Sequence, residues 1–203
     1  MNDKALFKLS YGLFVLTARQ GDRDIGFIIN TAIQAADGKI TVAVNKQNLT
    51  HDIIKETGAF TVSIHSEKAS FDLFKHFGFQ SGRSVNKFDG FKACKRGENG
   101  LYYITEGTNA YISGKVIETV DLGSHTLFVA TISDMEVLDS APSATYAFYH
   151  ASIKPKPAAQ PKPEKTVWRC TICGYIYEGE ELPADFVCPL CKHPASAFEK
   201  VGD

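Results

Sequence analysis

The first 150 residues contain several short stretches in which hydrophobic and polar positions alternate with a period of two. Such alternation is typical of strands with one buried face, and these stretches are also rich in β-branched and aromatic residues. Strands are predicted over Gly12–Thr17, Ile25–Asn30, Lys39–Asn45, Ala59–His65, Ala110–Glu118 and His125–Val137. Turns that contain glycine, such as Asp37-Gly38, separate them. The pattern predicts a mainly β fold, with an antiparallel barrel favoured over a parallel sheet.

Two segments follow the helical period instead. Helices are predicted over His51–Thr57 and Ser70–Phe77, each ended by a glycine. In the second helix, phenylalanine recurs at Phe71, Phe74 and Phe77, a spacing that aligns the three rings on one face. We interpret this stripe as facing the core.

The composition changes after residue 150. The stretch 152–165 holds four prolines and four lysines and almost nothing that could be buried. Proline at this density favours a semi-rigid, extended spacer. The chain therefore divides into a barrel domain at 1–150, a Pro/Lys linker at 151–165 and a small domain at 166–203.

The small domain holds four of the five cysteines, as the two Cys-x-x-Cys pairs formed by Cys170 with Cys173 and by Cys188 with Cys191. Each pair places two thiolates on one side of a tight loop, and two facing loops complete a tetrahedron of sulfur. A segment of fewer than about 40 residues usually needs a metal, disulfides or a partner to hold its fold. One site for zinc or iron is predicted, and spacing alone leaves a structural zinc ribbon as an equal alternative.

The residues around the cysteines favour iron. Three runs, WRCTICGYIY at 168–177, LPADFVCPLC at 182–191 and PASAF at 194–198, resemble rubredoxin, whose four cysteines hold one iron that carries one electron. Only fourteen residues separate Cys173 from Cys188, as in the shortened rubredoxins fused to other redox modules. Lys192 stands where free rubredoxins often have glycine, so strain in its backbone is expected.

Charge and hydropathy limit the partners. Residues 166–203 carry three basic and six acidic side chains, which argues against a ribbon that binds nucleic acid. The net charge of the whole chain is −1, and no stretch approaches the ~20 apolar residues of a membrane span. The apolar run at 11–16 is read as part of a first strand and not as a signal peptide. Four thiols committed to a metal, with Cys94 unpaired, point to a reducing cytoplasm.

Three polar stretches end strands or begin helices in the barrel domain, at 30–31, 45–50 and 80–84. They offer hydroxyl groups, amides, basic side chains and the N-terminal end of a helix, which together suit a phosphate. Each stretch also has an ordinary explanation, because Thr50 could be a helix cap and Ser81-Gly82 a common turn.

The barrel domain resembles the flavin reductase family, whose members bind FMN in a split barrel. The resemblance rests on the three polar stretches, on Phe60–Ile64, on Asn86–Phe88 and on Gly123–Phe128. It implies that FMN is bound by Asn30, Thr31, Asn45, Lys46, Asn48, Thr50, Ser81, Gly82 and Lys87, and that His125 lies against the nicotinamide. The family commonly has acidic residues where this chain has Asn86 and Ser124, and His125 could instead be a structural histidine.

As a whole, the chain is similar to the high molecular weight rubredoxins. This resemblance implies an NAD(P)H oxidoreductase, expected as a homodimer, that passes electrons from NADH through FMN to the iron and on to a flavodiiron protein that reduces nitric oxide or oxygen. No Gly-x-Gly-x-x-Gly fingerprint occurs, so NADH is expected on the flavin face. The alternative is an FMN-binding barrel with a structural zinc ribbon that acts as a sensor or adaptor without catalysis.

Overall fold

The computed structural model describes residues 2–155 and 167–201, which fall into two compact units with a boundary after Pro155. Residues 156–165, most of the predicted linker, lie outside the described part. The π-helical turn η2 (Tyr149–Ile153) places residues 151–153, the start of the predicted linker range, in the first unit, where Ile153 packs against the core.

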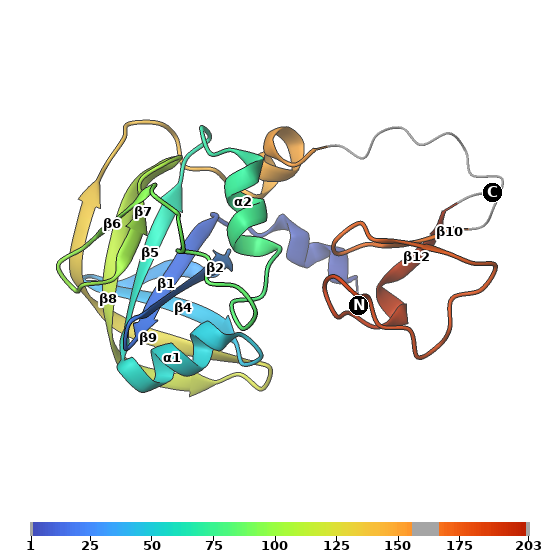
Figure 1. The fold of residues 1–203 in the computed structure, drawn as a ribbon, viewed down its shortest axis with the longest axis horizontal. Helices are drawn as coiled ribbons and strands as arrows, with labels where there is room; N and C mark the ends of the chain where they lie inside the picture. The colour runs from blue at the N-terminus through green and yellow to red at the C-terminus, as the bar shows by residue number, and fades with distance from the viewer. Residues whose placement is uncertain (1, 156–166, 202–203) are drawn as a thin grey trace. The chain divides into compact units, whose positions relative to one another are not determined.

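Seven strands of the first unit form one antiparallel sheet in the order β2-β1-β5-β8-β9-β4-β3 (Figure 1). They are β1 (Phe14–Gln20), β2 (Arg23–Ile29), β3 (Ala32–Ala36), β4 (Lys39–Asn45), β5 (Ala59–His65), β8 (Thr108–Asp121) and β9 (His125–Val137). A separate hairpin pairs β6 (Cys94–Arg96) with β7 (Tyr102–Ile104). The helices are η1 (Asp3–Lys8), α1 (Leu49–Thr57), α2 (Phe71–Gly78) and α3 (Tyr146–Phe148). The mainly β, antiparallel fold is confirmed.

Strands β4, β5 and β9 begin and end at the residues predicted from the sequence, whereas β8 is longer at both ends. The prediction missed β3 and the hairpin of β6 and β7. Strand β3 is an edge strand with the sequence AIQAA, and four of its five residues are exposed. An exposed edge needs no hydrophobic alternation, so it leaves little signal.

Strand β1 is buried on both of its faces. Phe14 and Leu16 belong to the larger core cluster inside the sheet, whereas Val15, together with Leu13 just before the strand, belongs to a second cluster with α2. Phe74 and Phe77 of α2 are completely buried in the second cluster, and Phe71 is partly buried beside it. The prediction that this stripe faces the core is therefore confirmed.

Helix α1 begins two residues earlier than predicted, after its N-cap Asn48, and ends at the predicted glycine. Gly58 adopts a left-handed conformation with a φ of 69°, and its N–H donates to the carbonyl of Ile54. This is a common way to end a helix, because glycine pays no Cβ penalty there. The helix packs on β1, β2 and β4, which brings its N-terminus close to β2. Within the described part of the chain, no helix is long and apolar enough to span a membrane.

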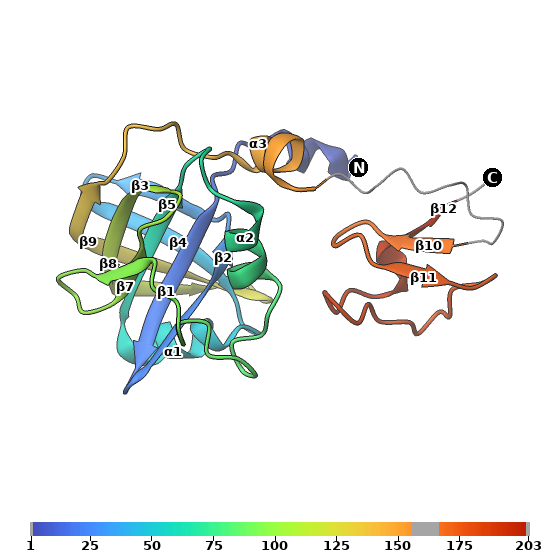
Figure 2. The same ribbon diagram turned by 45° about the horizontal axis from the view of Figure 1, so that its top comes forward.

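The second unit has a three-stranded antiparallel sheet in the order β11-β10-β12 (Figure 2). Its elements are β10 (Val167–Cys170), β11 (Ile176–Glu178), the 3-10 helix η3 (Ala195–Ala197) and β12 (Phe198–Val201). Five aromatic residues pack with the cysteines into one cluster: Trp168, Tyr175, Tyr177, Phe186 and Phe198. A core this small supports the view that the unit needs the stabilisation a metal provides.

Candidate functional site

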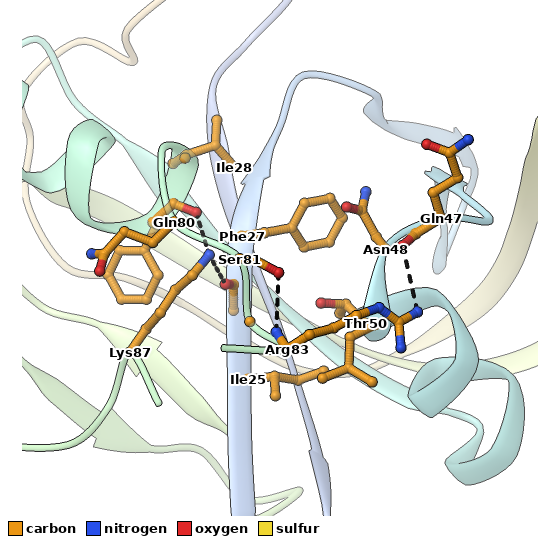
Figure 3. A pocket seen from close by; sticks show the side chains of 15 residues that line it. Ile25, Phe27, Ile28, Gln47, Asn48, Thr50, Gln80, Ser81, Arg83 and Lys87 are labelled. Atoms are coloured by element: carbon orange, nitrogen blue, oxygen red, sulfur yellow. Dashed lines mark hydrogen bonds between the residues drawn. The ribbon is translucent and has the colours of Figure 1, made fainter. Parts of the chain in front are cut away.

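A cavity of about 120 Å³ opens between the start of α1, strand β2 and the loop that follows α2 (Figure 3). Its apolar wall is formed by Ile25, Phe27 and Ile28 of β2 together with Phe77 of α2. Its polar lining comes from residues 47–50 on one side and residues 80–83 on the other. The apolar wall can therefore take a flat apolar ring, and the polar lining can take a charged group.

The N-terminus of α1 forms one polar wall. Its N-cap, Asn48, has an extended backbone, and its side chain makes no capping hydrogen bond to the helix. The buried Thr50 follows within the first turn. The first N–H groups of a helix lack partners within the helix and carry partial positive charge. This end of the cavity is therefore suited to an anion such as phosphate.

The loop after α2 forms the opposite wall, and the guanidinium group of its Arg83 extends to helix α1. The backbone N–H of Arg83 donates to Ser81 Oγ at 3.2 Å, and the guanidinium of Arg23 on β2 donates to the carbonyl of Gly82. Arg83 Nη2 makes a long contact of 3.5 Å to the Gln47 carbonyl (Figure 3) and another of 3.5 Å to Asp52 Oδ2. The Arg83 guanidinium thus links the two walls. A phosphate bound in the cavity could replace Gln47 and Asp52 as its partners.

Lys87 lines the cavity, but its ammonium group already donates hydrogen bonds to the protein backbone. Its Nζ donates to the carbonyls of Gly26 at 3.0 Å and Phe77 at 2.6 Å. Burial lowers the pKa of Lys87 to about 8. The ammonium group ties the end of α2 to β2, and an ammonium has one further N–H to offer a ligand.

Of the nine predicted flavin residues, the structure brings five to this cavity: Asn48, Thr50, Ser81, Gly82 and Lys87. The other four do not line it. Thr31 Oγ1 donates to the Ala43 carbonyl at 2.7 Å, Asn45 Oδ1 accepts from the Gln47 N–H at 2.9 Å, and Asn30 lies between β2 and β3. The Nζ of Lys46 forms an ion pair of 2.6 Å with Asp121.

His125 begins β9 directly opposite Asn45 of β4. Its Nδ1 lies 2.9 Å from Ser124 Oγ, and the Lys46 backbone N–H donates to the Ser124 carbonyl at 3.0 Å. Segment 45–50 therefore contacts the His125 turn at its beginning and lines the cavity at its end. Ser124 supplies the hydrogen bond to the ring at the position where an acidic residue is common in the flavin reductase family.

Three polar residues of the cavity, Gln47, Gln80 and Arg83, are absent from the predicted set although all three lie inside the polar stretches noted in the sequence. Their position next to predicted residues was the available signal. The apolar wall on β2 gave no such signal, because its residues resemble those of any buried strand.

In the second unit, all four Sγ atoms lie within 4.8 Å of one another. The distance from Cys170 Sγ to Cys191 Sγ is 3.5 Å, as is that from Cys173 Sγ to Cys188 Sγ. Tetrahedral coordination with metal–sulfur bonds of about 2.3 Å requires sulfurs about 3.8 Å apart. The predicted metal residues are thus brought together, and the donor set fits one tetrahedral ion.

The two cysteine loops repeat the same hydrogen bonds. The N–H of Gly174 donates to the Cys170 carbonyl at 2.9 Å, and the N–H of Lys192 donates to the Cys188 carbonyl at 2.9 Å. The first cysteine of each loop is buried and the second is half-buried. A bound ion would therefore lie near the surface, on the side of Cys173 and Cys191.

Comparison with known families agrees with both halves of this description. Residues 6–156 match the flavin reductase like domain, and residues 168–199 match the rubredoxin-like domain of rubrerythrin. The chain is also 36% identical to the high molecular weight rubredoxin of Moorella thermoacetica, over 99% of this chain and 100% of that protein. This chain belongs to the high molecular weight rubredoxin family. A high molecular weight rubredoxin joins the two domains whose sites are described above.

The reductase half has relatives without this fusion. The ferric-chelate reductase (NAD(P)H) of Archaeoglobus fulgidus is 39% identical, over 77% of this chain and 93% of its own length. Among solved structures, an FMN-binding protein from Thermus thermophilus aligns with a TM-score of 0.59 at 24% identity, covering 68% of this chain and 82% of that one. This last similarity establishes the fold of the first unit alone.

Proposed function

We propose that this high molecular weight rubredoxin transfers electrons from NAD(P)H, through FMN in the cavity beside α1, to one iron held by the four cysteines. One observation carries the proposal: a group of four cysteine Sγ atoms within 4.8 Å of one another is joined to a flavin reductase like domain in one chain. The relative from Archaeoglobus fulgidus, which is named as an NAD(P)H reductase, supports the choice of donor.

The two modules complement each other chemically. NAD(P)H gives up two electrons together as a hydride, whereas a four-cysteine iron accepts one electron at a time. FMN, when bound, accepts the pair and releases the electrons singly. The protein's own task is to hold the phosphate, exclude water from the reacting ring and place the nicotinamide.

The cavity residues fit this task. Arg83 and the first turn of α1 would hold the phosphate, and the β2 wall with Phe77 would cover the ring system. We assign the nicotinamide contact to His125, whose ring is oriented by Ser124.

A homodimer is part of the proposal. Sites for ligands of this kind usually enclose 300 Å³ or more, so a cavity of about 120 Å³ takes only part of a flavin. Exposed apolar side chains lie on β3, in the last part of β8 and directly after it, namely Ile33, Ile117, Val120 and Leu122. We propose that a second copy binds these side chains and supplies the part of the flavin site that one copy lacks.

The acceptor we propose is a flavodiiron protein that reduces nitric oxide or oxygen, as the resemblance to the family implies. The second unit carries an acidic stretch with Glu178, Glu180, Glu181 and Asp185. Such a surface steers encounters with a basic partner and makes their rate dependent on salt.

The visible spectrum and metal content of the purified protein test the proposal. We expect one iron per chain, with strong visible absorption that NADH bleaches under anaerobic conditions only when FMN is present. Stoichiometric zinc without iron would contradict the electron path and favour the zinc-ribbon adaptor. If neither NADH nor NADPH reduces the iron in FMN-loaded protein, NAD(P)H is not the electron donor.

A further inference from the structure

A buried histidine behind the cavity links the start of α1 to the start of β9. His51 Nδ1 lies 2.9 Å from Asp52 Oδ1, and its Nε2 lies 2.8 Å from Thr126 Oγ1. His51 and Thr126 are 5% and 7% exposed. The three groups form a chain of carboxylate, imidazole and hydroxyl that no part of the proposed electron path uses.

Thr126 directly follows His125, which begins strand β9. Successive side chains of a strand point to opposite faces, so Thr126 faces α1 while His125 faces the other way. The hydrogen bond between His51 and Thr126 therefore holds the start of β9 in place without involving the His125 ring.

The turn before β9 has a second attachment to the same segment. Asp121 Oδ1 accepts from Lys46 Nζ at 2.6 Å and from the Gly123 N–H at 2.7 Å. Lys46 lies before α1 and His51 lies in its first turn. Both ends of residues 46–51 thus hold the turn that carries His125.

The Asp52 end of this series of hydrogen bonds reaches the cavity. Asp52 Oδ2 lies 3.5 Å from Arg83 Nη2, in the wall where a phosphate would bind. The hydrogen bond from His51, with help from Arg83, holds the pKa of Asp52 below its usual value, so the carboxylate stays charged. Since a charged acceptor strengthens its hydrogen bond, Asp52 stabilises the orientation in which His51 reaches Thr126.

We propose that His51 is a positioning residue which, held by Asp52, fixes Thr126 and thereby places His125 for the nicotinamide. The proposal rests on the assignment of His125 in the proposed function. It predicts that the hydroxyl of Thr126 matters although it contacts no substrate.

A matched pair of substitutions isolates that hydroxyl. Thr126→Val removes it at constant shape, and Thr126→Ser keeps it. In full-length, FMN-loaded protein, Thr126→Val should raise the apparent dissociation constant of NADH about threefold to tenfold in single-turnover flavin reduction, the range for one lost hydrogen bond. FMN affinity should stay within about twofold, since no cavity contact is removed. Thr126→Ser should behave as the native protein.

A second pair of substitutions tests which of the two hydrogen bonds of His51 carries the positioning role. In His51→Gln the amide can replace Nε2 and keep the bond to Thr126, whereas in His51→Asn it can replace only Nδ1. NADH binding should therefore be closer to native in His51→Gln. The reverse order would assign the role to the Asp52 contact and overturn the proposal.

Hydrogen exchange provides a readout that needs no activity. The amides of residues 124–127 should exchange faster in Thr126→Val than in Thr126→Ser, with or without NADH. Native exchange and native NADH binding in Thr126→Val would overturn the positioning role. If NADH and NADPH do not reduce the native protein, the proposed function fails, and exchange at residues 124–127 still decides whether His51 fixes the start of β9.

Discussion

Lys192 occupies in the second cysteine loop the position that Gly174 occupies in the first. Both have left-handed backbones, with φ of 61° for Lys192 and 80° for Gly174, and each donates its N–H to the carbonyl of the first cysteine of its loop. Within the described residues, Lys192 is the only non-glycine residue with positive φ. The left-handed backbone from which strain at this position is expected is therefore present.

Lys192→Gly should raise the free energy of unfolding of the metal-loaded second unit by about 1 kcal/mol, because an L side chain in this conformation costs about 1–2 kcal/mol and glycine recovers only part of it through the entropy of the unfolded chain. Denaturation followed by the loss of metal–thiolate absorption measures the change. Gly174→Ala should shift stability in the opposite direction. Equal stability of Lys192→Gly and the native protein would show that the loop is not strained.

Arg83→Ala should weaken FMN binding about tenfold to a hundredfold, the range expected when one hydrogen bond to a charged group is lost. Titration of the flavin-free protein, followed by FMN fluorescence, gives the dissociation constant. Arg19→Ala is the matched control, since Arg19 lies on β1 and pairs with Asp22. A similar loss in both variants would indicate a general effect of charge and would remove Arg83 from the site.

His125→Ala should slow flavin reduction by NADH about tenfold while leaving the FMN content unchanged, because the ring is assigned to the nicotinamide and lies outside the cavity lining. Stopped-flow absorbance measures the rate. His150→Ala, an exposed position on η2, serves as the control. A native rate in His125→Ala would mean that the histidine is structural.

Ile117→Glu should convert the proposed dimer to a monomer and weaken FMN binding, because a carboxylate in an apolar interface must be desolvated without a partner. Sedimentation equilibrium measures the mass. Ile172→Glu is a matched control, since both isoleucines are 52% exposed and Ile172 lies in the second unit. A native protein that sediments as a monomer at micromolar concentration would reject the dimer.

The sequence predicted most reliably what depends on local chemistry. The four cysteines, the glycine that ends α1 and the bounds of β4, β5 and β9 all follow from spacing or alternation. The sequence could not show which polar groups remain available to a ligand. Thr31 and Lys46 have suitable donors, but a strand carbonyl and Asp121 occupy them, and these partners lie 12 and 75 residues away. The link from His51 to Thr126, also across 75 residues, exists only in the folded chain.

His65 gives the first unit a specific sensitivity to acid. The ring is completely buried, its Nδ1 lies 3.3 Å from Thr108 Oγ1, and its Nε2 has no hydrogen-bond partner in the described part of the chain. Burial lowers the pKa of His65 from 6.5 to about 4. Below pH 6.5 the unfolded chain therefore binds a proton that the folded chain excludes.

The sign of the effect follows from this difference. The contribution of neutral His65 is fully present above pH 6.5 and is lost as the pH falls toward 4, and it amounts to about 2 kcal/mol between about pH 7.5 and pH 5. His65→Asn keeps an amide that can bond Thr108 but does not titrate. The packing cost of His65→Asn should not change with pH. As the pH falls over this range, the native protein loses about 2 kcal/mol of unfolding free energy that the variant does not lose, so the difference between the two proteins should shrink by that amount. Urea denaturation at several pH values, followed by far-UV circular dichroism, measures both curves, and parallel curves would show that His65 is not the acid-sensitive group.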